Sequence, residues 1–187
     1  MESMTRSIGI FGVQQGVGVT TLSIAMTRYC SRRLKNRTAL VELSGNHELE
    51  ELQCQRCSGR HHAVREHYFA NARCEDMAEI AGCGCEYQVL DLGSEFYRIR
   101  SEFLRCDRKV IVVSLVPWKR KELDYFMSAI YREERMGDGV TFLAQFGKKE
   151  DKKDFQKTYG VPIFTLPYLG DILHLTDADV EFLCKLI

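Results

Sequence analysis

Hydrophobic residues in this chain gather into short, nearly continuous runs, and longer segments of mixed apolar and polar residues separate the runs. The apolar runs lie at residues 6–12, 38–43, 86–92, 109–116, 139–144 and 161–166, and their length is that of strands buried on both faces. The mixed segments at residues 19–34, 74–82, 95–106, 119–135 and 176–186 indicate helices. This alternation favours an α/β fold of three layers, in which helices cover both faces of a mostly parallel sheet.

The composition agrees with a single domain over residues 1–187. The 26 basic and 26 acidic residues balance, so the net charge predicts neither nucleic-acid binding nor attraction to an anionic membrane. No apolar run has the length of a membrane span, and none is placed like the core of an export signal. Eight cysteines in such a chain are most simply reduced thiols, so we expect a cytoplasmic protein. The charged segment Lys148–Asp154 mixes both signs and predicts an exposed face.

The segment Ser7–Leu22 carries the first candidate chemistry, because it predicts a buried strand, a glycine-rich loop and a helix start. Glycines permit positive φ and close backbone approach, and a helix N-terminus offers unpaired N–H groups and a positive dipole end to an anion. A standard phosphate-binding loop adds a lysine and a hydroxyl for Mg²⁺. Thr20 supplies the hydroxyl, but Val19 stands in place of the lysine. The pattern alone leaves two interpretations open, a phosphate site and a tight turn between strand and helix.

The loop Gly12–Thr21 resembles the deviant Walker A motif, K-G-G-x-G-K-T-T, of the ParA/MinD family of P-loop ATPases. The matching residues are Gly16, Gly18, Thr20 and Thr21. Gln14 stands at the signature lysine, which in the family reaches across a nucleotide-sandwich dimer. Gln15 replaces a glycine of the motif, and Val19 replaces the P-loop lysine.

Two later segments resemble the acidic motifs of the same family. Thr38–Asn46 resembles the second strand and the switch that follows it, with Glu42 at the first acidic position and Ser44 at the water-positioning aspartate. Tyr87–Gly93 resembles the Walker B strand, in which Asp91 matches the acid that helps to hold Mg²⁺.

Three further segments complete the resemblance in the order that the family requires. Val110–Val116 resembles the next core strand, and Val161–Tyr168 resembles the last strand and the loop that lies near the base. Arg65–Phe69 is a candidate for the extra strand that the family often has in this region. The resemblance therefore covers nearly the whole chain.

The resemblance implies ATP or ADP as the ligand, together with Mg²⁺. The nucleotide-binding positions that it carries over are Gly12, Gln14, Gln15, Gly16, Val17, Gly18, Val19, Thr20, Thr21 and Pro167, and the Mg²⁺ positions are Thr20 and Asp91. Phosphoryl transfer depends on positioned positive charge, and both lysines are replaced, so we expect no catalytic residue and a pseudo-ATPase. The alternative is a weakly active ATPase with an unconventional positive charge, for which the candidates are Lys119, Arg120 and Lys121.

We expect a degenerate member of this family that acts as a nucleotide-sensing or scaffold module in protein localisation or assembly. Within the superfamily, the TadZ-like placement proteins of secretion and pilus machinery are the nearest functional analogy. The resemblance implies protein partners and allows a homodimer. The C-terminal segment lacks the basic amphipathic extension of a membrane-targeting tail, so we expect no stable membrane insertion.

A second group of residues has the side chains of a metal site. Cys54 and Cys57, and further along Cys83 and Cys85, can supply the four thiolates that a tetrahedral Zn²⁺ requires. This spacing is only moderately specific. The other interpretation is dispersed free thiols that pack as small apolar residues, and we prefer it to a zinc-stabilised interaction module.

Overall fold

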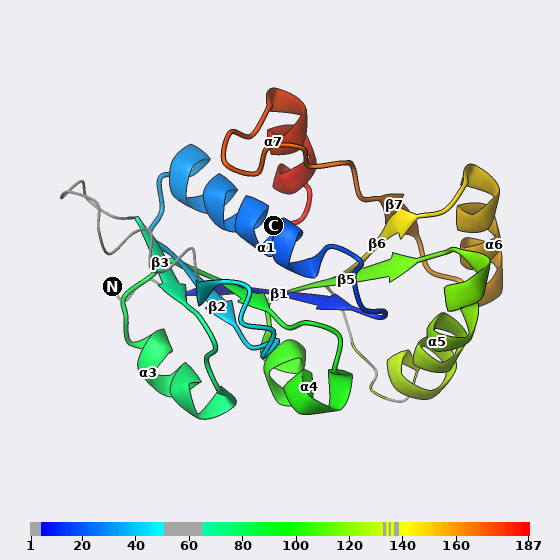
Figure 1. Cartoon of the computed structure of the whole chain (residues 1–187), viewed down its shortest axis with the longest axis horizontal. Coiled ribbons are helices and arrows are strands. Elements are labelled where there is room, and N and C mark those ends of the chain that lie inside the picture. The colour runs from blue at the N-terminus through cyan, green and yellow to red at the C-terminus, as the bar shows by residue number, and fades with distance from the viewer. Residues whose placement is uncertain (1–4, 51–64, 133, 135, 137–138) are drawn as a thin grey trace.

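The computed structural model describes residues 5–50, 65–132, 134, 136 and 139–187. Its centre is a seven-stranded sheet in the order β3-β2-β4-β1-β5-β6-β7, and all neighbouring strands are parallel (Figure 1). The strands are β1 Arg6–Gly12, β2 Thr38–Glu42, β3 Glu66–Phe69, β4 Tyr87–Asp91, β5 Arg108–Ser114, β6 Val140–Phe146 and β7 Ile163–Thr165. The helices are α1 Val19–Arg28, α3 Met77–Ala81, α4 Phe96–Arg105, α5 Arg120–Tyr125, α6 Lys149–Tyr159 and α7 Asp177–Cys184. The three-layer α/β fold is confirmed.

Shorter helical turns extend some of these helices. π-Helical turns over Tyr29–Arg33 and Phe126–Tyr131 continue α1 and α5, and 3₁₀ turns over Cys74–Asp76 and Pro117–Lys119 precede α3 and α5. Among the described residues, no helix is long and apolar enough to cross a bilayer.

The two faces of the sheet have separate cores, and consecutive residues of β1 contribute to each. Ile10 packs with Leu22 and Met26 of α1 and with Leu183 of α7. Phe11 points to the other face, where its ring lies 5.5–5.8 Å from those of three phenylalanines, Phe96, Phe103 and Phe126. Because both faces are covered, most positions of the central strands need apolar side chains, which explains the nearly continuous hydrophobic runs.

The sequence located the strands well, and it missed one helix. All six apolar runs form strands, and the candidate segment Arg65–Phe69 forms β3. Helix α6 was not predicted, because Lys148–Asp154 has only charged residues and carries no apolar period. Phe155 is the helix's one fully buried side chain, and Gly160 ends it with a left-handed φ of 72°.

The edge strand β3 is attached to the helix layer by a buried carboxylate. Glu66 is 6 % exposed, and it accepts hydrogen bonds from the hydroxyls of Ser31 at 2.6 Å and Tyr68 at 2.9 Å. The oxygen that accepts from Tyr68 also lies 3.2 Å from the guanidinium of Arg28, which is buried as well. This cluster neutralises two buried charges and joins β3 to the end of α1.

The strand order places the candidate site residues at one edge of the sheet. Strands β2, β4 and β1 are neighbours, and the register pairs Glu42 with Asp91 at their carboxyl ends. In open parallel sheets, ligands bind beyond the carboxyl ends of the strands where the order reverses. Here the order reverses at β1, whose following loop is the glycine-rich one.

Candidate functional site

The glycine-rich loop opens into a helix whose N-terminus has no cap. Gly18 is the N-cap residue of α1 with a left-handed φ of 90°, no side chain caps the helix, and its first turn has no acidic residue. The first N–H groups of α1 therefore have no intrahelical acceptor, and the positive end of the helix dipole is not neutralised locally. Both properties suit a bound anion.

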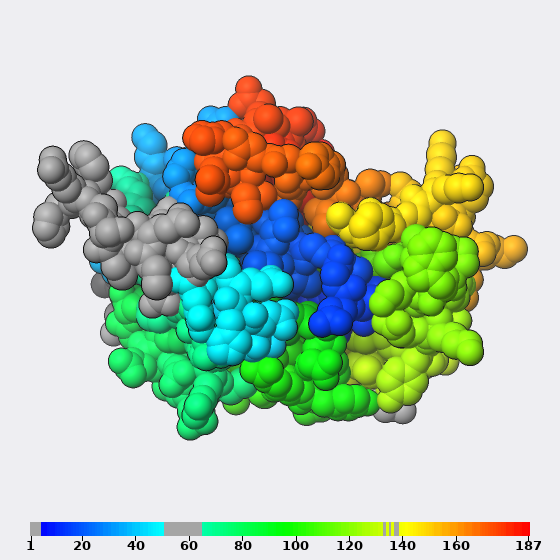
Figure 2. Space-filling view, in the orientation of Figure 1, coloured from blue at the N-terminus to red at the C-terminus, as the bar shows by residue number. Residues whose placement is uncertain are grey.

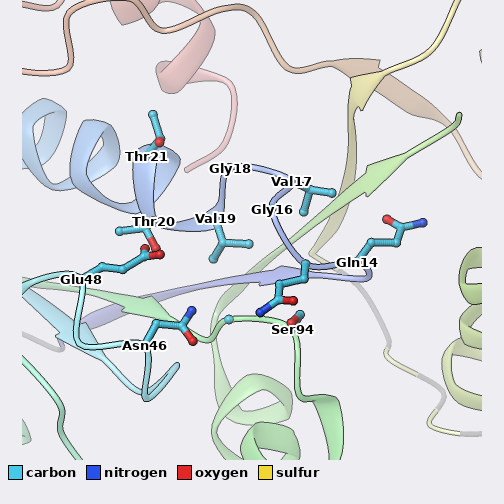
Figure 3. Close-up of a pocket in the computed structure, with 12 residues that line it drawn as sticks. Gln14, Gly16, Val17, Gly18, Val19, Thr20, Thr21, Asn46, Glu48 and Ser94 are labelled. Atoms are coloured by element: carbon cyan, nitrogen blue, oxygen red, sulfur yellow. The ribbon is translucent and has the colours of Figure 1, made fainter. Parts of the chain in front are cut away.

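A cavity of about 490 Å³ lies in front of this helix end (Figure 3). Its described lining residues are Gln14, Gln15, Gly16, Val17, Gly18, Val19, Thr20, Thr21, Asn46, Glu48, Gly93 and Ser94. Figure 2 shows this region of the surface, where the loop after β1, in blue, lies beside the loop after β2, in cyan. The loops after β1, β2 and β4 therefore form one concave site, as the strand order requires.

Val19, at the position of the P-loop lysine, has a packing role. Its side chain is 8 % exposed and belongs to the core beneath α1. A Cβ atom added to Gly12 would lie 2.8 Å from methyl groups of both Val17 and Val19. Gly12 is thus required for close approach of the loop to the end of β1, and Val19 fills the space above it.

Gln14, at the position of the signature lysine, is turned into the molecule. It is 1 % exposed, and its Oε1 accepts a hydrogen bond from the backbone N–H of Ser114 at 2.9 Å. Its Nε2 donates to the carbonyl of Ser114 at 3.2 Å and to that of Lys119 at 3.4 Å. The side chain joins the loop to the end of β5 and the start of α5, and in this conformation it does not extend toward a partner molecule.

Asp91 and Thr20 form the part of the site that suits a divalent cation. Asp91 is fully buried, and burial is the main cause that raises the pKa of its carboxyl to about 6. The Thr20 hydroxyl and the Gly93 N–H, which donates to Oδ1 at 3.2 Å, act in the opposite direction. Oδ2 has no partner with full hydrogen-bond geometry among the described residues. A buried, under-satisfied carboxylate oxygen beside a hydroxyl fits the oxygen ligands that Mg²⁺ prefers.

The loop after β2 is held by another buried carboxylate, that of Glu42. Its Oε1 accepts from the backbone N–H of Glu48 at 2.8 Å and from the Ser44 hydroxyl at 3.3 Å, and its Oε2 accepts from the N–H of Asn71 at 3.0 Å. Ser44, at the position of the water-positioning aspartate, also accepts from the N–H of Asn46 at 3.2 Å. Glu42 and Ser44 therefore shape the loop, and the side chains that it brings to the cavity are those of Asn46 and Glu48.

The charges around the cavity differ from those of a standard phosphate site. Among the described residues that line it, none is basic, and Glu48 is acidic. Lys119 lies 3.4 Å from Glu122, and Arg120 lies 2.9 Å from Asp124. Neither cation lines the cavity, and the same holds for Lys121. The sequence-based candidates for a replacement charge are thus placed outside the described site.

Neither a protein-family model nor a curated protein matches the sequence. Solved structures do match the fold. A plasmid partition protein from Borrelia burgdorferi, bound to AMPPNP, superposes with a TM-score of 0.69 at 12% identity, covering 98% of this chain and 97% of that chain. A chain of the MinC:MinD cell division protein complex of Aquifex aeolicus gives 0.61 at 15% identity, covering 87% of this chain and 81% of that chain. The ParA of pNOB8 bound to nonspecific DNA gives 0.55 at 11% identity, covering 98% and 93%.

The chain has the ParA/MinD-like P-loop fold. The superpositions extend over nearly the whole chain, which is the extent that the order of motifs predicted. At this level of identity they establish the architecture alone. The ligand and the activity have to be inferred from the residues of the site itself.

Some predicted residues are not among the described residues that line the cavity. Gly12 and Asp91 are buried at the ends of β1 and β4, next to the lining loops. Pro167 is half-buried after β7 and is not among the described residues that line the cavity. Cys54 and Cys57 lie outside the described residues, so the four-cysteine zinc site stays a prediction. Burial raises the pKa of the Cys85 thiol to about 12, with the Cys83 side chain as a further cause. Within the part of the chain that the structure describes, no group of three or more His, Cys, Asp or Glu side chains could hold a metal ion.

Glu48 is the site residue that the sequence did not reveal. It follows β2 at no motif position, and nothing in its immediate sequence distinguishes it from the neighbouring acid Glu50. The left-handed φ of 60° at His47 and the bond from the Glu48 N–H to Glu42 set where its side chain lies. Figure 3 shows the carboxylate of Glu48 beside Thr20.

Proposed function

We propose that this protein is a nucleotide-binding module of ParA/MinD-like fold with impaired hydrolysis, which acts as a nucleotide-sensing or scaffold component in protein localisation or assembly. One observation carries the proposal. The glycine-rich loop and the uncapped α1 N-terminus still line a cavity of about 490 Å³, although no basic side chain is among its described lining residues.

Backbone groups provide the basis for nucleotide binding. The N–H groups of the loop and of the first turn of α1 can donate to phosphate oxygens without any side chain. Thr20 and Asp91 would hold Mg²⁺, which would supply the positive charge that the missing lysines do not. The AMPPNP found in the Borrelia burgdorferi partition protein supports this assignment.

Impaired hydrolysis follows from the two substituted positions. Val19 and Gln14 are both buried and neutral, so neither can stabilise the negative charge of a phosphoryl-transfer transition state. Hydrogen bonds to charged groups contribute roughly 1.5–3 kcal/mol each. Losing two of them corresponds to a rate loss of roughly 10²- to 10⁴-fold.

The remaining parts of the proposal come from the fold. The MinC:MinD complex supports a protein partner, and a homodimer stays a prediction. The balanced net charge still predicts no nucleic-acid binding, and the DNA-bound ParA makes this a point to test directly. A cytoplasmic location is likewise our expectation. A weak ATPase and a zinc-stabilised module are the competing functions.

Titration calorimetry with Mg²⁺-ATP and Mg²⁺-ADP, combined with an assay of phosphate release, tests the proposal. We expect micromolar binding with turnover close to background, and a loss of affinity of about tenfold in Thr20→Val, which removes one polar contact. Thr158→Val, on the exposed side of α6, is the matched control and should bind like the wild type.

Three outcomes would contradict the proposal. Absence of nucleotide binding by folded protein would remove the nucleotide-sensing role. Robust turnover that disappears in Asp91→Ala would establish an active ATPase instead. Stoichiometric zinc in the purified protein would favour the zinc-stabilised module.

A further inference from the structure

The charge of the cavity indicates in which form, free or metal-bound, the nucleotide binds. This inference rests on the proposed function. Glu48 is the charged side chain among the described lining residues, and Asp91 lies directly behind Thr20. In addition to burial, Glu42 and, to a smaller extent, Glu48 both raise the pKa of Asp91, so the three carboxylates act on the same small region. Among the described lining residues none is basic, and the N-terminus of α1 contributes the equivalent of about half a positive elementary charge.

The loop holds the backbone of Glu48 in place, although its side chain is exposed. Its N–H is fixed to the fully buried Glu42, and the next residue, Leu49, is fully buried in the core beneath α1. Glu50 offers a direct contrast within the same loop. It pairs with His47 at 2.6 Å and does not line the cavity.

These charges act differently on free and metal-bound nucleotides. Free ATP carries about four negative charges at neutral pH, and it would approach Glu48, with the buried Glu42 and Asp91 nearby, without a compensating cation among the described lining residues. A bound divalent cation cancels two of those charges and offers ligand positions to Thr20 and Asp91. In a standard phosphate-binding loop the lysine provides charge even when metal is absent.

We propose that the cavity accepts a nucleoside polyphosphate only as its complex with a divalent cation, and that Glu48 is the residue that sets this selectivity. Val19 is the permissive substitution, because it removes the lysine that would otherwise hold metal-free phosphate. Glu48 then adds the repulsion that makes the metal obligatory.

Calorimetric titration of the full chain with ATP, in Mg²⁺ and in EDTA at one ionic strength, tests the inference. We expect the wild type to bind Mg²⁺-ATP at least about 100-fold more tightly than free ATP. Glu48→Gln should reduce that ratio by about tenfold, mainly through tighter binding of free ATP. Glu50→Gln is the matched control and should leave the ratio unchanged.

A second pair of variants separates charge from packing. Val19→Lys should restore binding in EDTA, and Val19→Met, of similar length but neutral, should not. Thermal denaturation of each variant identifies any loss of folding.

Equal wild-type affinity with and without Mg²⁺ would overturn the inference and leave the proposed function intact, as would an unchanged ratio in Glu48→Gln. Failure to bind either form would overturn the proposed function as well.

Discussion

At the scale of single residues, the site shows buried groups with roles that their motif positions do not state. Gln14 joins the loop to β5, and Val19 packs against Gly12, so both residues contribute to the folded structure. Asp91 keeps the residue type that the motif requires, at the carboxyl end of β4. It is also the group whose burial has the clearest energetic consequence.

Asp91 should make stability depend on pH. The pKa of its carboxyl is about 6 in the folded protein and 3.8 as its ordinary value, so the folded state binds the proton more tightly. Its stabilising contribution is full below pH 4 and is lost as the pH rises through about 6, a change of roughly 3 kcal/mol.

Urea denaturation in EDTA at pH 4 and pH 8 measures this effect. On going from pH 4 to pH 8, the wild type should lose that amount of stability relative to Asp91→Asn, because the asparagine amide does not titrate. A difference between the two proteins that does not change with pH would show that the carboxyl is not buried as described.

At the scale of elements, β3 depends on contacts from outside the sheet. It has four residues, pairs with β2 alone, and lies at the edge of the sheet. Its attachment to the end of α1 through Glu66 and Arg28 takes the place of a second neighbouring strand. Helix α6, at the other side of the sheet, is likewise held by few buried residues, chiefly Phe155.

Glu66→Gln should therefore destabilise the protein strongly. The change removes the negative charge that balances the buried Arg28 guanidinium, and breaking such a pair costs about 3–5 kcal/mol. Urea denaturation gives the free energy of unfolding. The matched control is Glu181→Gln. Glu181 lies 2.9 Å from Lys185 in an exposed ion pair, so this variant should behave like the wild type. Equal effects of the two variants would place Glu66 in solvent.

At the scale of the whole molecule, the reactivity of the cysteine thiols tests which parts of the fold are buried. Cys30, Cys85 and Cys106 are buried in different parts of the structure, and burial raises the pKa of each thiol to about 12. Cys184 is exposed near the C-terminus of α7. One labelling experiment can therefore examine both faces of the sheet.

We expect alkylation of native protein, mapped by mass spectrometry, to modify the exposed Cys184 before the buried Cys30, Cys85 and Cys106. The three buried thiols should react roughly a thousandfold more slowly than ordinary thiols, because thiolate is the reactive form and raising the pKa from 9.0 to about 12 reduces the thiolate fraction by that factor. In denaturant all of them should react alike. Rapid native labelling of Cys85 would contradict the position of β4, and protection that zinc chelators remove would support the zinc site.

The sequence by itself determined the strands, their succession along the chain and the glycine-rich loop. A strand buried on both faces is apolar at most of its positions, so β1, β2, β4 and β5 are visible in the local pattern. The loop needs glycine where φ is positive, as at Gly18, and this is also a local requirement.

The tertiary structure decided what the site residues do. Gln14 meets Ser114 a hundred positions along the chain, and the loop after β2 brings Glu48 beside Thr20. Helix α6 depends on the burial of Phe155 in the core. Such contacts join segments that are distant in sequence, so no local pattern contains them. The charge of the cavity, and with it the expected demand for a metal-bound nucleotide, arises only when the loops after β1, β2 and β4 converge.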